Sequence, residues 1–167
     1  MKTKTLILVR HAKSSWKNLD LDDHDRPLNK RGKRDLPEMG ERLKGEIEGP
    51  ALIISSTAKR ATKTAKGLCQ ALGYELDCIK LDAEVFGASK QKLIKVIRST
   101  SNTSDQIMLV GHNPGMAEAA DYLSRSKITS MPTCAVAIFK FAIEEWIEVN
   151  PSSATLIYYD YPKNIDR

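Results

Sequence analysis

The sequence predicts a three-layer α/β/α sandwich built around a mostly parallel sheet. Short apolar runs alternate with segments of helical periodicity along most of the chain. Several of these runs are apolar at consecutive positions, which is typical of strands buried on both faces of a parallel sheet. Near the end of the chain the strands follow one another without a helix between them. This order predicts an antiparallel strand at an edge of the sheet.

Length and composition restrict the class of protein. The chain of 167 residues has the size of one domain, and we expect a single domain over residues 1–167. The net charge of +5 favours acidic partners, but the lysines and arginines are spread along the chain without interleaved aromatic residues. We therefore expect no nucleic-acid partner. The three cysteines form no CxxC pair, which predicts reduced thiols and neither a disulfide framework nor a zinc site.

The sequence also indicates in which cellular compartment to expect the protein. It contains no apolar run of about 18 residues, the length that a transmembrane helix needs, so we expect no membrane association. The first 13 residues include too short an apolar stretch for a signal peptide, and no small-residue cleavage site follows it. We therefore expect a cytoplasmic protein.

The first predicted strand delivers charged side chains to an edge of the sheet. Its apolar sequence LILV, residues 6–9, ends abruptly in Arg10 and His11. Ligands of open α/β sheets bind at the carboxyl ends of the strands, where these two side chains would lie. An arginine–histidine pair is a weak signal by itself, because it could simply mark where the strand meets water. Residues 14–28 have no sustained periodicity and predict a long loop, and loops of this length are usually functional.

Two helices and a second strand are expected in the next part of the chain. Asn29 is a suitable N-cap for the first helix. Pro37 lies inside the helical pattern and predicts a kink or two short helices. Residues 51–55 form the second buried strand, and the helix that follows it stops at Gly73.

The second half of the chain supplies the rest of the sheet. Ser89 is predicted to cap a helix, and Asn113 to cap another with Pro114 as its first residue. Further strands are expected at residues 75–81, 106–110, 135–141 and 154–159, with residues 146–149 as a candidate hairpin partner.

Side chains with N–H donors follow three of the predicted strands. They are Arg10 with His11, Arg60 in the segment SSTAKR, and His112 with Asn113. If the three strands are neighbours, these groups converge at one edge of the sheet. Helices opened by Ser56 or Thr57 and by Asn113 would direct their N-terminal amides to the same place. Two arginines, two histidines and two helix N-termini predict a pocket for a dianion such as a phosphoryl group.

Four sequence blocks resemble the histidine phosphatase superfamily. They are RHA at the end of the first strand, RPL followed by RG, SSTAKRATKTA, and GHNPG. Within that superfamily, RHAKSSW and DDHDRPLNKRG resemble the SixA-like phosphohistidine phosphatases, and the match extends from residue 6 to about residue 141. The resemblance implies a phosphoglycerate-mutase-like fold. It also implies a phosphatase that uses no metal or other cofactor.

The resemblance implies a role for each matching side chain. His11 would be the nucleophile that forms a phosphohistidine intermediate, which suits a neutral imidazole. Arg10 and Arg60 would bind phosphoryl oxygens, and His112 would donate a further hydrogen bond. Ala12 stands in place of the superfamily's usual glycine, a substitution that is common in the SixA-like branch.

Two further matches leave alternatives open. Ser14 matches a serine that contacts phosphate in mutase relatives, and the alternative is that it caps the loop. Glu84 matches the general acid of many relatives, and the alternative is a solvated carboxylate, because a phosphohistidine needs less help to leave than a phosphoester does. We expect Arg26 to pair with an acid of the cluster Asp22, Asp23 and Asp25. His24 is expected to be a loop histidine and no metal ligand.

The function expected from these residues is hydrolysis of a phosphorylated histidine on a protein. Only about 25 residues separate the third and fourth strands, which leaves no room for a lid over the pocket. An uncovered pocket suits a phosphate presented by another protein, for example a histidine-phosphotransfer domain, to a monomeric enzyme. The alternatives are a phosphatase of small phosphomonoesters and a non-catalytic phosphate-recognition module. The presence of both histidines and both arginines disfavours the second alternative, because binding alone needs no nucleophile.

Overall fold

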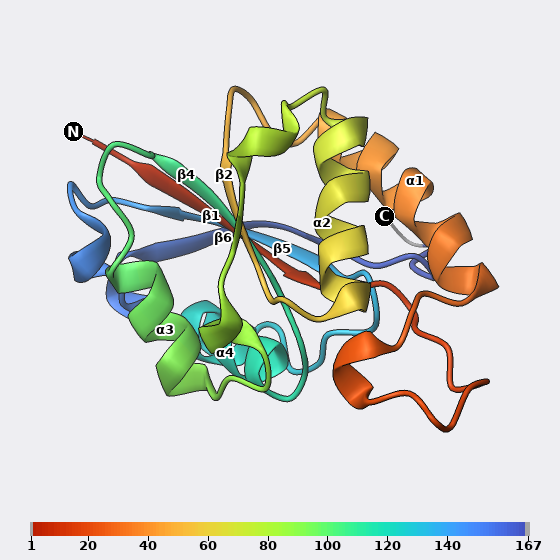
Figure 1. Cartoon of the computed structure of the whole chain (residues 1–167). Coiled ribbons are helices and arrows are strands. Elements are labelled where there is room, and N and C mark those ends of the chain that lie inside the picture. Colours follow the sequence, from red (N-terminus) through yellow and green to blue (C-terminus); the bar gives the residue numbers. More distant parts are fainter. Residues whose placement is uncertain (1, 166–167) are drawn as a thin grey trace.

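A computed structural model, which describes residues 2–165, contains one six-stranded sheet with helices on both faces (Figure 1). The strands are β1 (Lys4–Arg10), β2 (Leu52–Ser55), β3 (Ile79–Leu81), β4 (Gln106–Gly111), β5 (Val136–Phe141) and β6 (Ala154–Asp160). Their order across the sheet is β3-β2-β4-β1-β5-β6. β1 to β4 are parallel, β5 is antiparallel to β1, and β6 is antiparallel to β5. The predicted fold class, with antiparallel pairing at one edge, is confirmed.

Four helices form the outer layers. They are α1 (Lys30–Lys44), α2 (Lys59–Ala71), α3 (Lys90–Arg98) and α4 (Gly115–Ser124). α1 and α2 cover one face of the sheet, and α3 and α4 cover the other (Figure 1). Along β1, Leu6 and Leu8 pack toward α3 and α4, whereas Ile7 and Val9 pack toward α1 and α2. All four side chains are completely buried, which explains why this strand is apolar at consecutive positions.

The strand register brings the carboxyl ends of β1, β2 and β4 together. Arg10 lies opposite Gly111, and Ser55 lies opposite Val110. The backbone N–H of His11 donates to the carbonyl of Gly111 at 3.1 Å, so the pairing continues past the end of the strands. The three polar segments that follow these strands therefore start from one edge of the sheet, as the sequence predicts.

Several local predictions are confirmed. The Asn29 side chain accepts from the N–H of Gly32, and the Ser89 side chain accepts from the N–H of Lys92. α4 begins one residue later than predicted, with Pro114 as its N-cap, while the Asn113 side chain accepts from the N–H of Ala117. Among the helices of residues 2–165, none combines the length and the apolar character that a membrane span needs.

Two strand predictions are wrong. The third strand starts at Ile79, because residues Leu76–Cys78 form a 3-10 turn. Residues 146–149 are not a strand, since Trp146–Glu148 is another 3-10 turn. This turn buries the Trp146 ring completely and lets its indole N–H donate to the Ser104 carbonyl at 2.7 Å.

Pro37 does not divide its helix. α1 runs through it as a single helix, with Pro37 exposed and its neighbours Leu36 and Met39 buried. The burial of both halves of α1 against the sheet holds the helix together despite the backbone hydrogen bond that a proline removes.

Candidate active site

A pocket of about 300 Å³ lies at the carboxyl ends of β1 and β4. Five of the six side chains that the sequence nominates line it, namely Arg10, His11, Ser14, Arg60 and His112. The remaining lining residues are Lys13, Trp16, Asp23, Arg26, Asn113 and Thr133. The convergence of β1, α2 and β4 thus brings two arginines and two histidines into one small space.

His11 has the geometry of a neutral nucleophile. Its Nδ1 lies 2.7 Å from the carbonyl oxygen of Ala12. A carbonyl only accepts hydrogen bonds, so Nδ1 carries the proton and Nε2 keeps its lone pair. Burial lowers the pKa of His11 to about 3, with a smaller contribution in the same direction from His112 and the two arginines, and against the effect of the Ala12 hydrogen bond. The imidazole is therefore uncharged at neutral pH and can use Nε2 for attack.

His112 is arranged as a hydrogen-bond donor. Its ring lies 5.1 Å from the ring of His11, and its Nε2 lies 2.7 Å from the Ser56 hydroxyl oxygen. A hydroxyl can donate once and accept twice, and this one accepts from the N–H of Ala58; in the His112 tautomer that can donate to a phosphoryl oxygen from Nδ1, the hydroxyl proton goes to Nε2. Nδ1 then carries the ring proton, and it is buried without a partner in the described chain. Burial, and then the charge of Arg60, lower the pKa of His112 to about 4.

The two arginines keep donors available for an anion. Arg10 uses Nη1 to bind the Met131 carbonyl at 3.0 Å, and Arg60 uses both Nη atoms to bind Asp23. In both side chains Nε is buried and has no partner among residues 2–165. Burial, reinforced by the charge of Arg60, lowers the pKa of Arg10. Unpaired buried donors are costly, and an oxyanion in the pocket would satisfy them.

Asp23 connects the loop of residues 14–28 to the pocket. Its carboxylate accepts from Arg60 Nη2 at 3.0 Å and from Arg26 Nη1 at 2.7 Å. Partial burial alone would raise the pKa of Asp23, but the hydrogen bonds from Arg26 and Arg60 outweigh it and lower that pKa. The prediction that Arg26 pairs with an acid of its own loop is confirmed. The link from Asp23 to Arg60 was not predicted.

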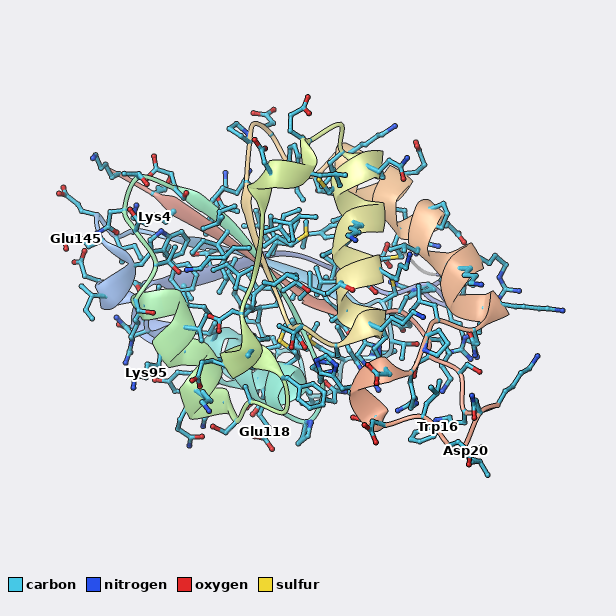
Figure 2. All side chains as sticks on the ribbon, viewed as in Figure 1. Lys4, Trp16, Asp20, Lys95, Glu118 and Glu145 are labelled. Atoms are coloured by element: carbon cyan, nitrogen blue, oxygen red, sulfur yellow. The ribbon has the colours of Figure 1, made fainter. Side chains whose placement is uncertain are left out.

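Arg26 organises the wall of the pocket. Its Nη2 donates to the Ser14 hydroxyl, and its Nε donates to the Ser15 carbonyl at 3.2 Å. Its guanidinium also lies 3.3 Å from the ring centroid of Trp16. Trp16 remains 64% exposed, on the loop that projects from the body of the molecule (Figure 2). Ser14 therefore lines the pocket while its oxygen is held by Arg26.

Glu84 is not brought into the pocket. It lies in the 3-10 turn Ala83–Val85 after β3, is exposed, and pairs with Lys92 at 2.7 Å. The hydrogen bond from Lys92 lowers the pKa of Glu84, whereas a general acid needs a raised pKa. The nearby Phe86 contacts the site instead, with its ring 5.4 Å from that of His112. The geometry thus favours the solvated-carboxylate alternative for Glu84.

His24 lies closer to the site than expected of a loop histidine in solvent. Its Nε2 is 2.8 Å from the Thr57 hydroxyl, and its ring is 5.0 Å from that of Phe86. Within residues 2–165, no group of three or more His, Cys, Asp or Glu side chains is arranged to hold a metal ion.

Some side chains that shape the site were not identified as functional from the sequence, among them Ser56, Asp23 and Thr133. Ser56 orients His112, Asp23 holds Arg60, and Thr133 lines the pocket from the loop before β5. Ser56 stands in the block SSTAKR and Asp23 stands in the acidic cluster, so both were close to a recognised signal. Thr133 carries no such signal, because its place depends on the pairing of β5 with β1.

A sheet edge that combines a neutral buried histidine with unpaired arginine donors defines a phosphoryl-transfer site. Comparison with protein families agrees, since residues 6–85 match the model of the histidine phosphatase superfamily (branch 1). The chain belongs to this superfamily. The predicted membership is confirmed.

Individual relatives and solved structures are also similar to this chain. A chloroplast protein of Arabidopsis thaliana, itself uncharacterised, is 35% identical over 154 residues, which are 87% of this chain and 70% of the relative. A structure from Agrobacterium tumefaciens, assigned as phosphohistidine phosphatase SixA, superposes with a TM-score of 0.78 at 25% identity, over 95% of this chain and 98% of that chain. The protein histidine phosphatase SixA in complex with tungstate has a TM-score of 0.75 at 18% identity, over 95% and 97% of the two chains. The last similarity concerns the fold alone.

Proposed function

We propose that this protein hydrolyses phosphohistidine on other proteins through a phosphohistidine intermediate on His11. One observation carries the proposal: three buried donors without partners, Arg10 Nε, Arg60 Nε and His112 Nδ1, belong to residues that surround the neutral His11. Such donors suit the charge on the oxygens of a phosphoryl group in transfer.

The residues suggest a two-step reaction. In the first step the lone pair of His11 Nε2 forms a bond to phosphorus while the bond from phosphorus to the substrate imidazole breaks, and the leaving imidazole takes up a proton from solvent. In the second step a water oxygen forms a bond to the phosphorus of phospho-His11 while the bond from phosphorus to Nε2 breaks and its electron pair returns to Nε2; a proton of the water goes to solvent, and inorganic phosphate leaves. Arg10, Arg60 and His112 hold the oxygens in both steps.

Two features support a phosphohistidine substrate. Glu84, the expected general acid, lies outside the pocket, and an imidazole leaving group depends less on such an acid than an alkoxide does. Between β3 and β4 the chain contains only a 3-10 turn and α3, which leaves no segment for a lid over the pocket. An uncovered pocket suits a phosphate presented by another protein. The similarity to the assigned SixA phosphatase of A. tumefaciens supports the same substrate class.

The proposal is tested by comparing turnover of a phosphohistidine peptide with turnover of p-nitrophenyl phosphate. We expect preference for the peptide and transfer of radiolabelled phosphate to wild-type protein but not to a His11→Ala variant. Faster hydrolysis of the ester would move the assignment to small phosphomonoesters, and absence of any turnover would favour a phosphate-recognition module.

We also propose that the protein acts as a cytoplasmic monomer without a metal, so activity should survive EDTA and sedimentation should give the monomer mass.

A further inference from the structure

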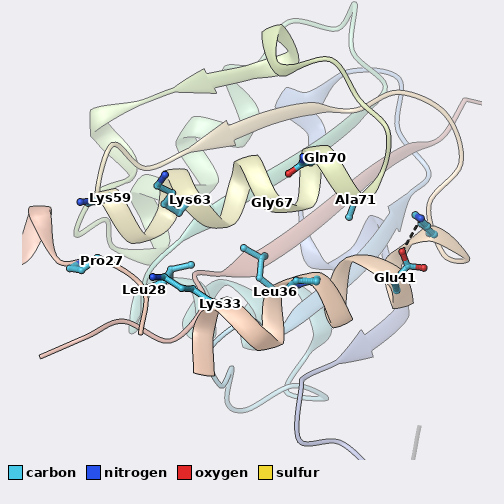
Figure 3. Close-up of a pocket in the computed structure, with 12 residues that line it drawn as sticks. Pro27, Leu28, Lys33, Leu36, Glu41, Lys59, Lys63, Gly67, Gln70 and Ala71 are labelled. Atoms are coloured by element: carbon cyan, nitrogen blue, oxygen red, sulfur yellow. Dashed lines mark hydrogen bonds and ion pairs between the residues drawn. The ribbon is translucent and has the colours of Figure 1, made fainter. Parts of the chain in front are cut away.

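A second hollow lies on the outer face of the α1–α2 layer and shares no residue with the phosphate pocket (Figure 3). Its volume is about 810 Å³, against about 300 Å³ for the phosphate pocket. We call it the α1–α2 groove. It is lined by Pro27, Leu28, Lys33, Leu36, Pro37, Glu41, Lys44, Lys59, Lys63, Gly67, Gln70 and Ala71.

The base of the groove is apolar. Leu28 and Leu36 belong to the core beneath it, and Pro37 and Ala71 add further apolar surface. Gly67 faces Leu36 between the two helices, and a Cβ at residue 67 would lie only 2.4 Å from Leu36 Cδ2. The absence of a side chain at Gly67 therefore allows α1 and α2 to pack closely and leaves the space above Leu36 open.

The walls of the groove carry uncompensated positive charge. Of the four lysines, only Lys44 has an acidic partner within residues 2–165, namely Glu41 at 2.9 Å. Lys33, Lys59 and Lys63 are exposed and make no ion pair in that part of the chain. They lie together at one end of the groove, away from Glu41 (Figure 3). An occupant must therefore be acidic at this end and apolar toward the base.

The basic end of the groove adjoins the phosphate pocket. Lys59 directly precedes Arg60, and Pro27 directly follows Arg26. Both arginines line the phosphate pocket. A molecule with its phosphoryl group at His11 could therefore extend past Lys59 into the groove.

We propose that the α1–α2 groove binds an acidic amphipathic helix of the protein that presents the phosphohistidine. This inference rests on the proposed function and adds a second point of contact to it. Apart from the Lys33 carbonyl, whose helical partner Pro37 has no N–H, the backbone groups inside α1 and α2 are paired within each helix. The groove therefore offers no row of free backbone groups with which an extended segment could pair, whereas a helix satisfies its own backbone. The lining contains no aromatic side chain for stacking bases, which disfavours a nucleic acid.

The test uses a fluorescent peptide of about twelve residues, long enough for about three helical turns. Leucines on one face and glutamates elsewhere supply the proposed chemistry, and a second peptide with glutamine for every glutamate is the control. Fluorescence anisotropy measures the binding of both peptides to wild type, to Lys63→Glu and to Lys66→Glu. Lys66 is an exposed lysine of α2 that does not line the groove, so it is a matched control.

We expect wild type to prefer the glutamate peptide, and Lys63→Glu to weaken that binding about fivefold while Lys66→Glu changes it less than about twofold. Attaching the same helix to a phosphohistidine peptide should lower KM for wild type but not for Lys63→Glu. Turnover of p-nitrophenyl phosphate should be equal in all three proteins.

Equal binding of the two peptides, or equal effects of the two substitutions, would overturn the proposal. So would binding of adenosine triphosphate that depends on Lys63 when the glutamate peptide does not bind, because the groove would then be a small-anion site. If no phosphohistidine peptide is hydrolysed but binding of the glutamate peptide depends on Lys63, the proposed function fails and the groove assignment stands.

Discussion

The two sides of the candidate site are built differently. On the phosphate side, Arg10, His11, Arg60 and His112 are held by the ends of β1, β4 and the start of α2, and the last three are at most 7% exposed. On the opposite side, Glu84 is exposed in a 3-10 turn and paired with Lys92. The groups that would stabilise a phosphoryl group are thus fixed by the sheet, whereas the group that would protonate a leaving oxygen is not. This contrast fits a substrate whose leaving group departs from phosphorus without a proton from an acid of the enzyme.

The largest effect should come from the nucleophile. Replacing His11 with alanine should lower kcat by at least on the order of a thousandfold, because the covalent route is lost. Vanadate binding, measured by calorimetry, should persist because Arg10, Arg60 and His112 remain. Retention of more than a tenth of the activity would remove His11 from the nucleophile role.

The next effect concerns Arg60. Arg60→Ala should lower kcat on the order of a hundredfold, as expected for one donor to the transition state. Arg60→Lys keeps the charge but loses the planar fork, so it should recover only part of this loss. A matched control is Lys59→Ala, which removes a neighbouring exposed charge outside the pocket and should leave turnover of p-nitrophenyl phosphate unchanged.

Acidification tests the burial of the phosphate side. Protonation removes the lone pair of His11, and its pKa of about 3 places this loss far below neutral pH. After correction for substrate ionisation, kcat/KM should change less than about threefold between pH 7 and pH 5, whereas a histidine of ordinary pKa, about 6.5, would lose about 25-fold. In the unfolded chain His11 has an ordinary pKa and binds its proton more readily than in the folded protein. The free energy of unfolding should therefore decrease as pH falls below about 6.5. A 25-fold loss of kcat/KM between pH 7 and pH 5 would contradict the burial of His11.

A smaller effect is expected at Ser56. Ser56→Ala removes the hydroxyl that is hydrogen-bonded to His112 Nε2 and would fix the tautomer of the ring, so kcat should fall about tenfold. Ser55→Ala is the control, because the Ser55 hydroxyl donates to the Ser56 carbonyl and not to His112. Circular dichroism checks that both variants are folded. Similar activity of the two variants would show that Ser56 does not orient His112.

The smallest effect should come from the opposite side of the site. Glu84→Gln should change kcat on a phosphohistidine peptide by less than about twofold, because Glu84 is held by Lys92 outside the pocket. A loss of tenfold or more would mean that Glu84 moves into the pocket during turnover, and it would weaken the contrast between the two sides.

The sequence was informative where local pattern determines structure. The apolar run of β1 and the cap at Asn29 follow from residue type and spacing, and they place His11 at a sheet edge. Contacts between distant segments were not accessible in this way. Asp23 reaches Arg60 across 37 positions, and Thr133 reaches the pocket only through the pairing of β5 with β1. Glu84 aligned with a catalytic position, but its placement depends on the Lys92 side chain of the next helix.

The two tryptophans give the protein an internal optical probe. Trp146 is completely buried, and its surroundings do not depend on the pocket, whereas Trp16 is exposed, lines the pocket and lies against the Arg26 guanidinium. An oxyanion that draws Arg26 or its loop toward the site would change the emission of Trp16 above a constant signal from Trp146. Occupancy of the pocket could then be followed by intrinsic fluorescence in unlabelled protein, with Trp16→Phe as the blank.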